Sequence, residues 1–227
     1  MTRTERGSQA RRARADRILD AAADLLLRHG YRRVSIDDVA AEAGVGKGTI
    51  YLHWKTREAL FWAALQRETM RLLEDLVRRL GENPALALPD RLMPAIYADV
   101  SRKPLVRALL VNDAEILGAL GADQEVAAAQ REFAGNPDYL EMLAAHGLLR
   151  DDLTPAKAGR ILGRMMAGFF TQAAGDDDAD DLADILSRTL MTEAPYQKNA
   201  VTALCLDVTA LFQGIIAVQR QQLERAY

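Results

Sequence analysis

Hydrophobic positions along this 227-residue chain recur every three or four residues, which is the spacing of a helix with one buried face. The first such run, through Ile18, Ala22 and Leu26, predicts a helix over residues 14–29. Gly30 is expected to end it, because glycine readily adopts the left-handed conformation that terminates helices. No stretch alternates apolar and polar residues as a half-buried strand would. The pattern therefore predicts an all-α protein.

Residues 35–54, SIDDVAAEAGVGKGTIYLHW, predict two short helices joined by a tight turn at Gly44. Ser35, followed three residues later by Asp38, has the spacing of a capping box at the start of the first helix. Such a pair presents its second helix on the surface, where the helix can enter a DNA groove. The exposed face of that helix is expected to contain Gly46, Lys47, Gly48, Thr49, Tyr51 and His53.

Two glycines on this face are unusual for a helix. In a helix interior, glycine costs roughly 1 kcal/mol relative to alanine. Close approach of the backbone to a phosphate or a base would account for Gly46 and Gly48.

A long helix is predicted from Thr56 to about Leu80, with Gly81 ending it, and at 1.5 Å per residue it spans about 37 Å. Prolines divide the rest of the chain into shorter helices, because proline favours helix starts and breaks. The expected ranges are 90–102, 104–120, 123–133, 137–146, 155–174, 180–192 and 196–225.

Two late helices are apolar around more of their circumference than one core needs. In the last one, apolar side chains follow a spacing of three and four residues through three heptads: Val201, Leu204, Val208, Leu211, Ile215 and Val218. The helix over 155–174 has a similarly wide apolar face. Two interpretations stay open, namely an interface with a second copy and burial within one subunit.

Charge is distributed unevenly along the chain. The net charge is −3, yet residues 1–57 carry 12 basic and 7 acidic residues, whereas the remainder carries 17 and 25. A basic end on an acidic body suits a protein that contacts phosphate at one end only. Residues 1–13 are expected to form a basic flexible arm, which is either a solvated tail or a source of phosphate and minor-groove contacts.

Several function classes lack support in the sequence. The single Cys205 excludes an internal disulfide framework, and there is no cluster of cysteines and histidines with metal-ligand spacing. No catalytic motif or phosphate-binding glycine loop is found, so no enzymatic activity, metal or cofactor is expected. No signal segment and no apolar run long enough to span a membrane is expected, which indicates a cytoplasmic protein.

Residues 18–61 resemble the DNA-binding domain of the TetR family of bacterial regulators. The matching features are HGY at the end of the first helix, the segment VSIDDVAAEAGVGKGTIYLHW, and KTREALF at the start of the long helix. The rest of the chain resembles the family in helical character and length. The resemblance implies a helix-turn-helix domain over 14–57, after the arm over 1–13, and a helical effector-binding and dimerisation domain over 58–227.

The resemblance also assigns roles to residues. It implies that Lys47, Gly48 and Thr49 lie at the major-groove end of the recognition helix. It implies phosphate contacts from Ser35, Tyr51, His53 and Lys55. Trp54 stands where the family usually has phenylalanine and is expected in the core.

Dimerisation and ligand binding are further implications of the resemblance. A four-helix dimer interface would use two late helices of each subunit, with Leu162, Met166, Phe170, Leu204, Val208, Leu211 and Ile215. A ligand pocket would lie between the long helix and the helices after it. Its candidate residues, each of which plain core packing would also explain, are Trp62, Met93, Tyr97, Leu110, Phe133, Met142, His146, Met165 and Phe169. Their apolar character points to a hydrophobic or aromatic ligand.

The sequence thus predicts a homodimeric, all-α regulator of transcription, with a three-helix DNA-binding domain joined by a long helix to a helical body. The expected partners are double-stranded DNA, a second copy and a small-molecule effector. The protein is expected to act as a repressor that binds a palindromic operator and is released from it when the ligand binds. Two alternatives are a ligand-independent architectural or constitutive DNA-binding protein and a helix-turn-helix module used for protein contacts.

Overall fold

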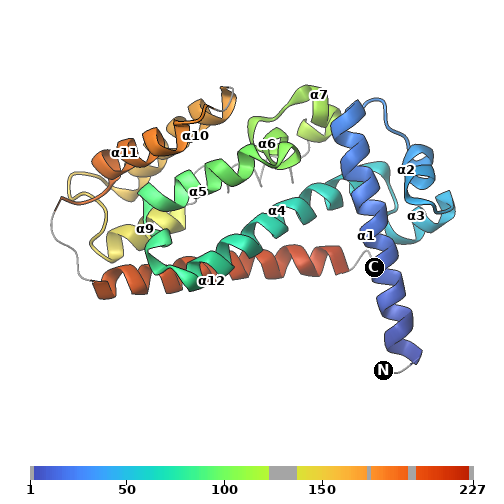
Figure 1. Ribbon diagram of the computed structural model, residues 1–227, viewed down its shortest axis with the longest axis horizontal. Coiled ribbons are helices and arrows are strands. Elements are labelled where there is room, and N and C mark those ends of the chain that lie inside the picture. The colour runs from blue at the N-terminus through green and yellow to red at the C-terminus, as the bar shows by residue number, and fades with distance from the viewer. Residues whose placement is uncertain (1–2, 123–136, 173–174, 194–197, 225–227) are drawn as a thin grey trace.

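The computed structural model describes residues 3–122, 137–172, 175–193 and 198–224, which form an elongated arrangement of helices (Figure 1). A head at one end contains α1 (Arg3–His29), α2 (Ile36–Ala43) and α3 (Lys47–His53). Helix α4 (Arg57–Glu82) leaves the head and runs through the body. The helix expected over 123–133 lies outside the described residues.

The body is built from short helices and one long C-terminal helix. Its elements are η1 (Pro84–Ala87), α5 (Pro89–Ser101), α6 (Pro104–Val111), α7 (Ala114–Leu117), η2 (Gly118–Ala122), α9 (Pro137–Ala145), α10 (Pro155–Thr171), α11 (Asp178–Leu190) and α12 (Lys198–Glu224). Helix α12 lies beside α4, and α11 lies against α5 (Figure 1). Within the described ranges, the β pairing is an isolated bridge between Leu149 and Met191, so the all-α prediction is confirmed.

Two hydrophobic cores lie at opposite ends of α4. The head core contains fully buried side chains from α1, α3 and the first half of α4, among them Ile18, Ile50 and Phe61. The body core takes the second half of α4, including Leu76, together with side chains of the helices that follow. Because α4 is one continuous helix, movement in the body core can be transmitted to the head.

Most predicted helix boundaries agree with the structure to within three residues, and the largest difference is at the N-terminus. Helix α1 begins at Arg3 instead of about residue 14, so the structure describes residues 3–13 as helix and not as a flexible arm. Arginine and alanine make up six of the eleven residues 3–13, and both favour helix. Helix α4 also passes Gly81 and ends at Glu82.

The single helix expected over 104–120 is broken in the structure. Helix α6 ends at Asn112, which has a left-handed backbone with φ of 52°. The carboxylate of Asp113 then accepts hydrogen bonds from the backbone N–H groups of Glu115 and Ile116, which caps α7. Asparagine tolerates the left-handed region and aspartate is a preferred N-cap, so this Asn-Asp pair is a local stop and start signal.

The break lets the body pack tightly against the head. The backbone N–H of Tyr31 donates to the Ile116 carbonyl at 2.8 Å. At Gly30, where φ is 71°, a Cβ atom would lie 2.4 Å from the backbone oxygen of Glu115. Glycine is therefore required here both for its backbone conformation and for the close approach of α7.

Candidate DNA-binding surface

Local hydrogen bonds fix the start of α2. The Ser35 hydroxyl accepts from the Asp38 backbone N–H at 3.2 Å, and the Ser35 backbone N–H donates to Asp38 Oδ2 at 2.8 Å. The predicted capping box is confirmed. Hydrogen bonds from the side chain and backbone of Ser35 hold the pKa of Asp38 below its ordinary value. At the other end, Gly44 takes the left-handed conformation with φ of 64° and opens the turn into α3.

Helix α3 is anchored by its inner face. Ile50 is fully buried, and Trp54, which follows the helix, is 3% exposed. The expectation that Trp54 belongs to the core is thus confirmed. These two side chains fix the rotation of α3, so that the opposite face points to solvent.

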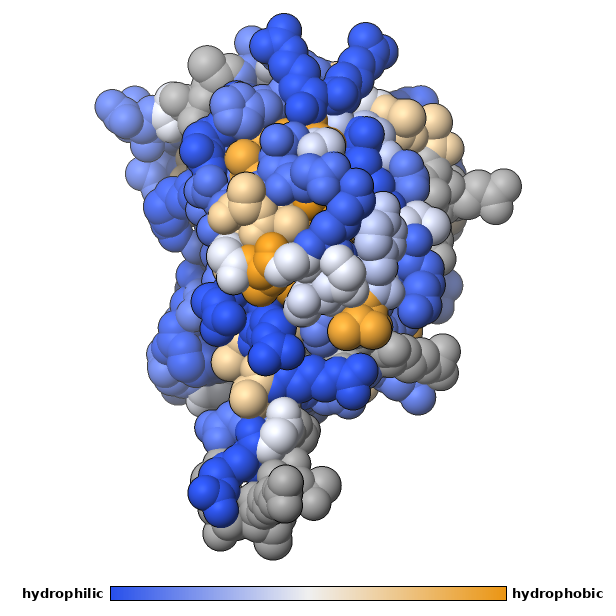
Figure 2. Space-filling view, turned by 90° about the vertical axis from the view of Figure 1, so that its right-hand side faces the viewer, coloured by the Kyte–Doolittle hydropathy of each residue, from blue (hydrophilic) through white to orange (hydrophobic). Residues whose placement is uncertain are grey.

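The outer face of α3 is exposed and chemically mixed. Gly46, Lys47 and Gly48 are exposed, Thr49 is partly buried, and Tyr51 is 39% exposed. Figure 2 looks at this end of the molecule and shows a mostly hydrophilic surface with scattered apolar side chains. Sequence reasoning missed Leu52, which is 69% exposed on the same short helix. An exposed leucine there can contact the methyl group of a thymine.

Neither glycine of this surface is explained by packing inside the chain. A Cβ atom at Gly48 would meet nothing within 4 Å, and one at Gly46 would only reach the Thr49 hydroxyl at 4.0 Å. The backbone at Gly46 has φ of −74°, which any residue adopts. The absence of side chains leaves the backbone of the α3 N-terminus open to solvent, where a phosphate or base edge can approach it.

Charged side chains border this end of α3. Lys47 Nζ donates to Asp37 Oδ2 at 2.7 Å, a hydrogen bond that raises the pKa of Lys47. The pair is solvent-exposed, so Lys47 can exchange this partner for a phosphate at little cost. Lys55 Nζ donates to the Tyr51 carbonyl at 3.2 Å and keeps a positive charge beside the C-terminal end of α3.

His53 does not lie on the exposed face where it was expected. Its side chain is 7% exposed, and its ring lies 5.3 Å from the ring of Trp54. The prediction of an exposed His53 is wrong, because the last turn of α3 rotates this position toward the head core. Its proposed phosphate contact has no support from this geometry.

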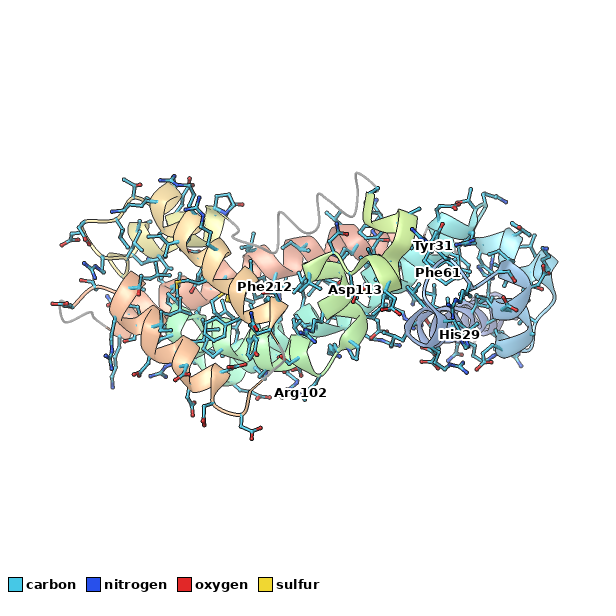
Figure 3. All side chains as sticks on the ribbon, turned by 90° about the horizontal axis from the view of Figure 1, so that it is seen from above. His29, Tyr31, Phe61, Arg102, Asp113 and Phe212 are labelled. Atoms are coloured by element: carbon cyan, nitrogen blue, oxygen red, sulfur yellow. The ribbon has the colours of Figure 1, made fainter. Side chains whose placement is uncertain are left out.

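A cluster around Tyr31 fixes the head at the start of α4. The Tyr31 hydroxyl donates to Glu58 at 2.6 Å, and the guanidinium of Arg57 lies 3.9 Å from the centre of the Tyr31 ring. Burial, followed by the hydrogen bond to Glu58, raises the pKa of Tyr31 to about 12. Phe61 completes the cluster with an edge-on ring contact at 5.5 Å (Figure 3). These contacts tie the segment after α1 to the first turns of α4.

The candidate pocket residues divide between the two cores. Tyr97 is buried in the body core, and partly buried side chains that pack against that core are Met93, Leu110, Met142, Met165 and Phe169. The rings of Tyr97 and Phe169 meet at 5.8 Å. Trp62, by contrast, packs against the head core, because its turn of α4 still lies within the head. His146 lies at the end of α9 and is 2.7 Å from Asp207, and Phe133 lies outside the described residues.

The expected dimer residues are mostly buried within one chain. Exposure is 6% or less for Leu162, Met166, Phe170, Leu204 and Val208, and Leu211 and Ile215 are partly buried. The first five pack in the chain's own body core and are not available to a second copy, so their assignment as contact residues is wrong. On α12 the large exposed apolar side chains are instead Leu206, at 67%, and Val218, at 57%.

Helix α12 also departs from the expectation that no segment could span a membrane. By length and composition it could, and 28% of its most apolar 18-residue window is buried within the chain, but one such helix is weak evidence for a membrane. In the structure its inner face packs against α4 and η1.

Among the described residues there is no group of three histidine, cysteine, aspartate or glutamate side chains that could hold a metal ion.

Comparison with known proteins agrees with this geometry. Residues 18–64 match the model of the bacterial regulatory proteins of the tetR family. An HTH-type transcriptional regulator of Mycobacterium tuberculosis is 32% identical over 175 residues, which cover 75% of this chain and 81% of the relative. The DNA-binding transcriptional repressor TetR of Mycobacteroides abscessus is 30% identical over 172 residues, which cover 66% of this chain and 90% of the relative.

A solved structure shares the fold across head and body. The transcriptional regulator FadR from Bacillus subtilis, determined in complex with stearoyl-CoA, superposes with a TM-score of 0.55 at 16% identity, covering 75% of this chain and 96% of that chain. With an anchored recognition helix, an exposed outer face and relatives aligned over most of their length, this chain belongs to the tetR family of bacterial DNA-binding transcriptional regulators.

Proposed function

We propose that this protein is a cytoplasmic, homodimeric repressor that holds a palindromic operator through α3 and leaves it when a small hydrophobic ligand binds the body. The observation that carries the DNA-binding part is the outer face of α3, where Gly46, Lys47, Gly48 and Tyr51 are exposed while Ile50 anchors the opposite side. Lys47, Gly48 and Thr49 would face the major groove. Ser35, Tyr51 and Lys55 would contact phosphates on either side.

The arginines of α1 extend this basic surface. At 3.6 residues per turn, Arg6, Arg14 and Arg17 lie within about 40° of Arg28 around the helix. Arg28 is paired with Glu42 of α2 at 2.8 Å, so this stripe is on the side of α1 where the helix-turn-helix lies. A helical stripe of this kind suits phosphate contacts along the DNA backbone and is too wide to enter a minor groove.

A second copy is required because one short helix reads few base pairs. The exposed face of α12 offers the surface: Leu206 and Val218 are exposed, and the small residues Ala210, Gly214 and Ala217 are exposed between them. Small side chains let two helices approach closely. A two-fold pair places two recognition helices in successive major grooves, roughly 34–36 Å apart.

The ligand site is proposed in the body, beside Tyr97 and Phe169. Partly buried methionine and aromatic side chains gather there, and methionine adapts its shape to apolar ligands. The FadR structure, which shares the fold, holds stearoyl-CoA. Ligand binding would favour a state in which the two heads are spaced wrongly for the operator, and α4 would transmit the change.

The test is selection of bound DNA from random or genomic fragments by the full-length protein, followed by measurement of affinity for the selected palindrome. Lys47→Ala and Tyr51→Ala should each weaken operator binding by about tenfold to a hundredfold, since a base or phosphate contact is lost in both subunits. Lys157→Ala is the matched control, because Lys157 is exposed on α10, in the body.

Two further measurements complete the test. Light scattering should show that all three variants remain dimers. The salt dependence of binding should fall only for Lys47→Ala, because only this variant removes a positive charge from the DNA-binding surface. Stearoyl-CoA is the first effector to examine for release of the operator. Unchanged affinity in both α3 variants would contradict the proposed docking, and the absence of any selected sequence would contradict the proposed function.

A further inference from the structure

The C-terminal end of α12 is built into the DNA-binding head. Helix α12 runs beside α4 (Figure 1), and its last turn contacts α1 through Glu224 and Arg12. Leu223 is 3% exposed and belongs to the head core, whereas Leu204, five turns earlier on the same helix, is fully buried in the body core. One helix therefore places side chains in both cores.

Polar contacts surround the Leu223 insertion. Gln66 Nε2 of α4 donates to Gln222 Oε1 at 2.5 Å. Arg12 of α1 donates to Glu224 Oε1 at 2.6 Å. These contacts join the last turn of α12 to both long helices of the head.

A second set of contacts braces the same junction from the α4 side. The Arg67 side chain is 4% exposed, and it donates to the Asp16 carbonyl at 2.9 Å and to Asp20 Oδ1 at 2.6 Å, which ties α4 to α1. Arg220 of α12 donates to Glu74 of α4 at 2.6 Å. Between the three helices lies a cleft of about 500 Å³ whose arginines are paired with carboxylates of the chain. The cleft is thus a helix junction and offers no uncompensated charge to a ligand.

The same helix carries the surface proposed for the second copy. Leu206 and Val218 are exposed on the outer side of α12, while Leu223 is inserted in the head. In a two-fold dimer, α12 would therefore connect the dimer axis to each head without passing through α4. The angle between α12 and the head would set the distance between the two α3 helices.

We propose that residues Arg220–Glu224, the C-terminal latch, fix the orientation of each head relative to the dimer axis and so determine which spacing between operator half-sites the protein accepts. This inference rests on the proposed dimeric, DNA-binding function. The latch residues touch no DNA and act by positioning α3. The exposed ion pairs contribute little on their own, so the insertion of Leu223 and the Gln66–Gln222 bond are the main elements.

The latch has two competitors for the same role. Helix α4 is continuous from head to body, and α7 packs against Gly30 and Tyr31. If these contacts position the head by themselves, removing the latch will leave the half-site spacing unchanged. The dependence of affinity on half-site spacing therefore decides the proposal, and a general loss of affinity does not.

The experiment compares the double variant Leu223→Ala/Gln222→Ala with the wild type on a series of operators whose central spacer is changed by one or two base pairs. Each added base pair moves a half-site by about 3.4 Å and rotates it by about 34°. The wild type should lose about tenfold or more in affinity for each such change. The latch variant should bind the best operator more weakly and lose less than about threefold per change.

Leu204→Ala is the matched control, since it makes the same substitution in the same helix but in the body core. It should keep the wild-type spacing profile, whatever its effect on stability. A latch variant with the wild-type profile would overturn the proposal. Gln222→Ala alone, with exposed Gln221→Ala as its control, repeats the comparison without a cavity in the core if the double variant fails to fold.

A second readout does not need an operator. Cys205 is buried, so a spin label at Arg33→Cys, which is exposed in the head, can report the distance between the two heads. With the label in place, the distribution of this distance should be narrow in the otherwise wild-type protein and in Leu204→Ala. It should be broad in the latch variant. An equally narrow distribution in the latch variant would overturn the latch. The absence of any dipolar signal in the wild type would instead overturn the proposed dimer.

Discussion

Replacing Gly48 with alanine should make the protein more stable and a weaker binder of its operator. Gly48 is the second residue of α3, and a Cβ atom built there meets nothing within 4 Å. Alanine is favoured over glycine in a helix by about 1 kcal/mol, and in the first turn we expect about 0.5–1 kcal/mol. For a chain of this size, that gain corresponds to a rise in Tm of about 1–4 °C.

The effect on DNA binding should have the opposite sign. The added methyl group would stand on the outer face of α3, between the backbone and the DNA. Displacing one base contact costs about 1–3 kcal/mol, and the proposed dimer would lose the contact in both heads. The free energy of operator binding should therefore weaken by at least about 2 kcal/mol, which is a loss of about 30-fold in affinity.

Thermal unfolding followed by circular dichroism measures the change in Tm. Fluorescence anisotropy with a labelled operator, at a fixed salt concentration, measures the change in affinity. Gly81→Ala is the control, because Gly81 lies exposed in α4 with nothing within 4 Å and is far along the chain from α3. It should raise Tm without changing affinity. If Gly48→Ala lowers Tm, the glycine serves the packing of the head, and if affinity is unchanged, the backbone of α3 does not approach DNA closely.

Two further predictions concern the dimer and the junction of head and body. Leu206→Asp places a charge on the exposed face of α12 without disturbing the core, since Leu206 is 67% exposed. In sedimentation, this variant should shift from dimer to monomer while its helical content stays the same. A persistent dimer would exclude this face as the dimer interface. Gly30→Ala should lower the free energy of unfolding by about 1–3 kcal/mol from backbone strain alone, because φ is 71°. The loss should be larger still if α7 stays in place, because the new Cβ would lie 2.4 Å from the Glu115 oxygen. A denaturant titration beside Gly81→Ala checks this value: a loss no larger than the strain would mean that α7 moves away, and an unchanged midpoint would contradict the left-handed conformation of Gly30.

Prediction from the sequence succeeded where the relevant contacts are local. The capping box of Ser35 and Asp38 spans three residues, and Gly44 ends α2 through its own backbone conformation. Local pattern also placed Ile50 on the inner face of α3 and Lys47 and Tyr51 on the outer face. Even the unexpected break of α6 has a local cause in Asn112 and Asp113, which a closer reading of cap signals would have found.

Contacts between distant segments explain where prediction failed. His53 is buried because the end of α3 turns toward the head core, which α1 and α4 also build, and no pattern within α3 distinguishes His53 from exposed Tyr51. Trp62 belongs to the head because the head core continues into α4 beyond the helix-turn-helix. Helices α10 and α12 are apolar on several sides, so sequence alone left undecided which side each buries.

By itself, the sequence determined the all-α class, the helix-turn-helix and the exposure of the first turn of α3, since hydrogen bonds and periodicities within twenty residues fix all three. Only the tertiary structure decided that Leu204 and Val208 are buried within one chain, that Leu206 and Val218 are exposed, and that Leu223 enters the head. The physical reason is that the sequence of a helix that is apolar on several sides does not show which neighbouring helix covers each side. That choice is made by the packing of α12 against α4 and α1, segments more than a hundred residues away along the chain.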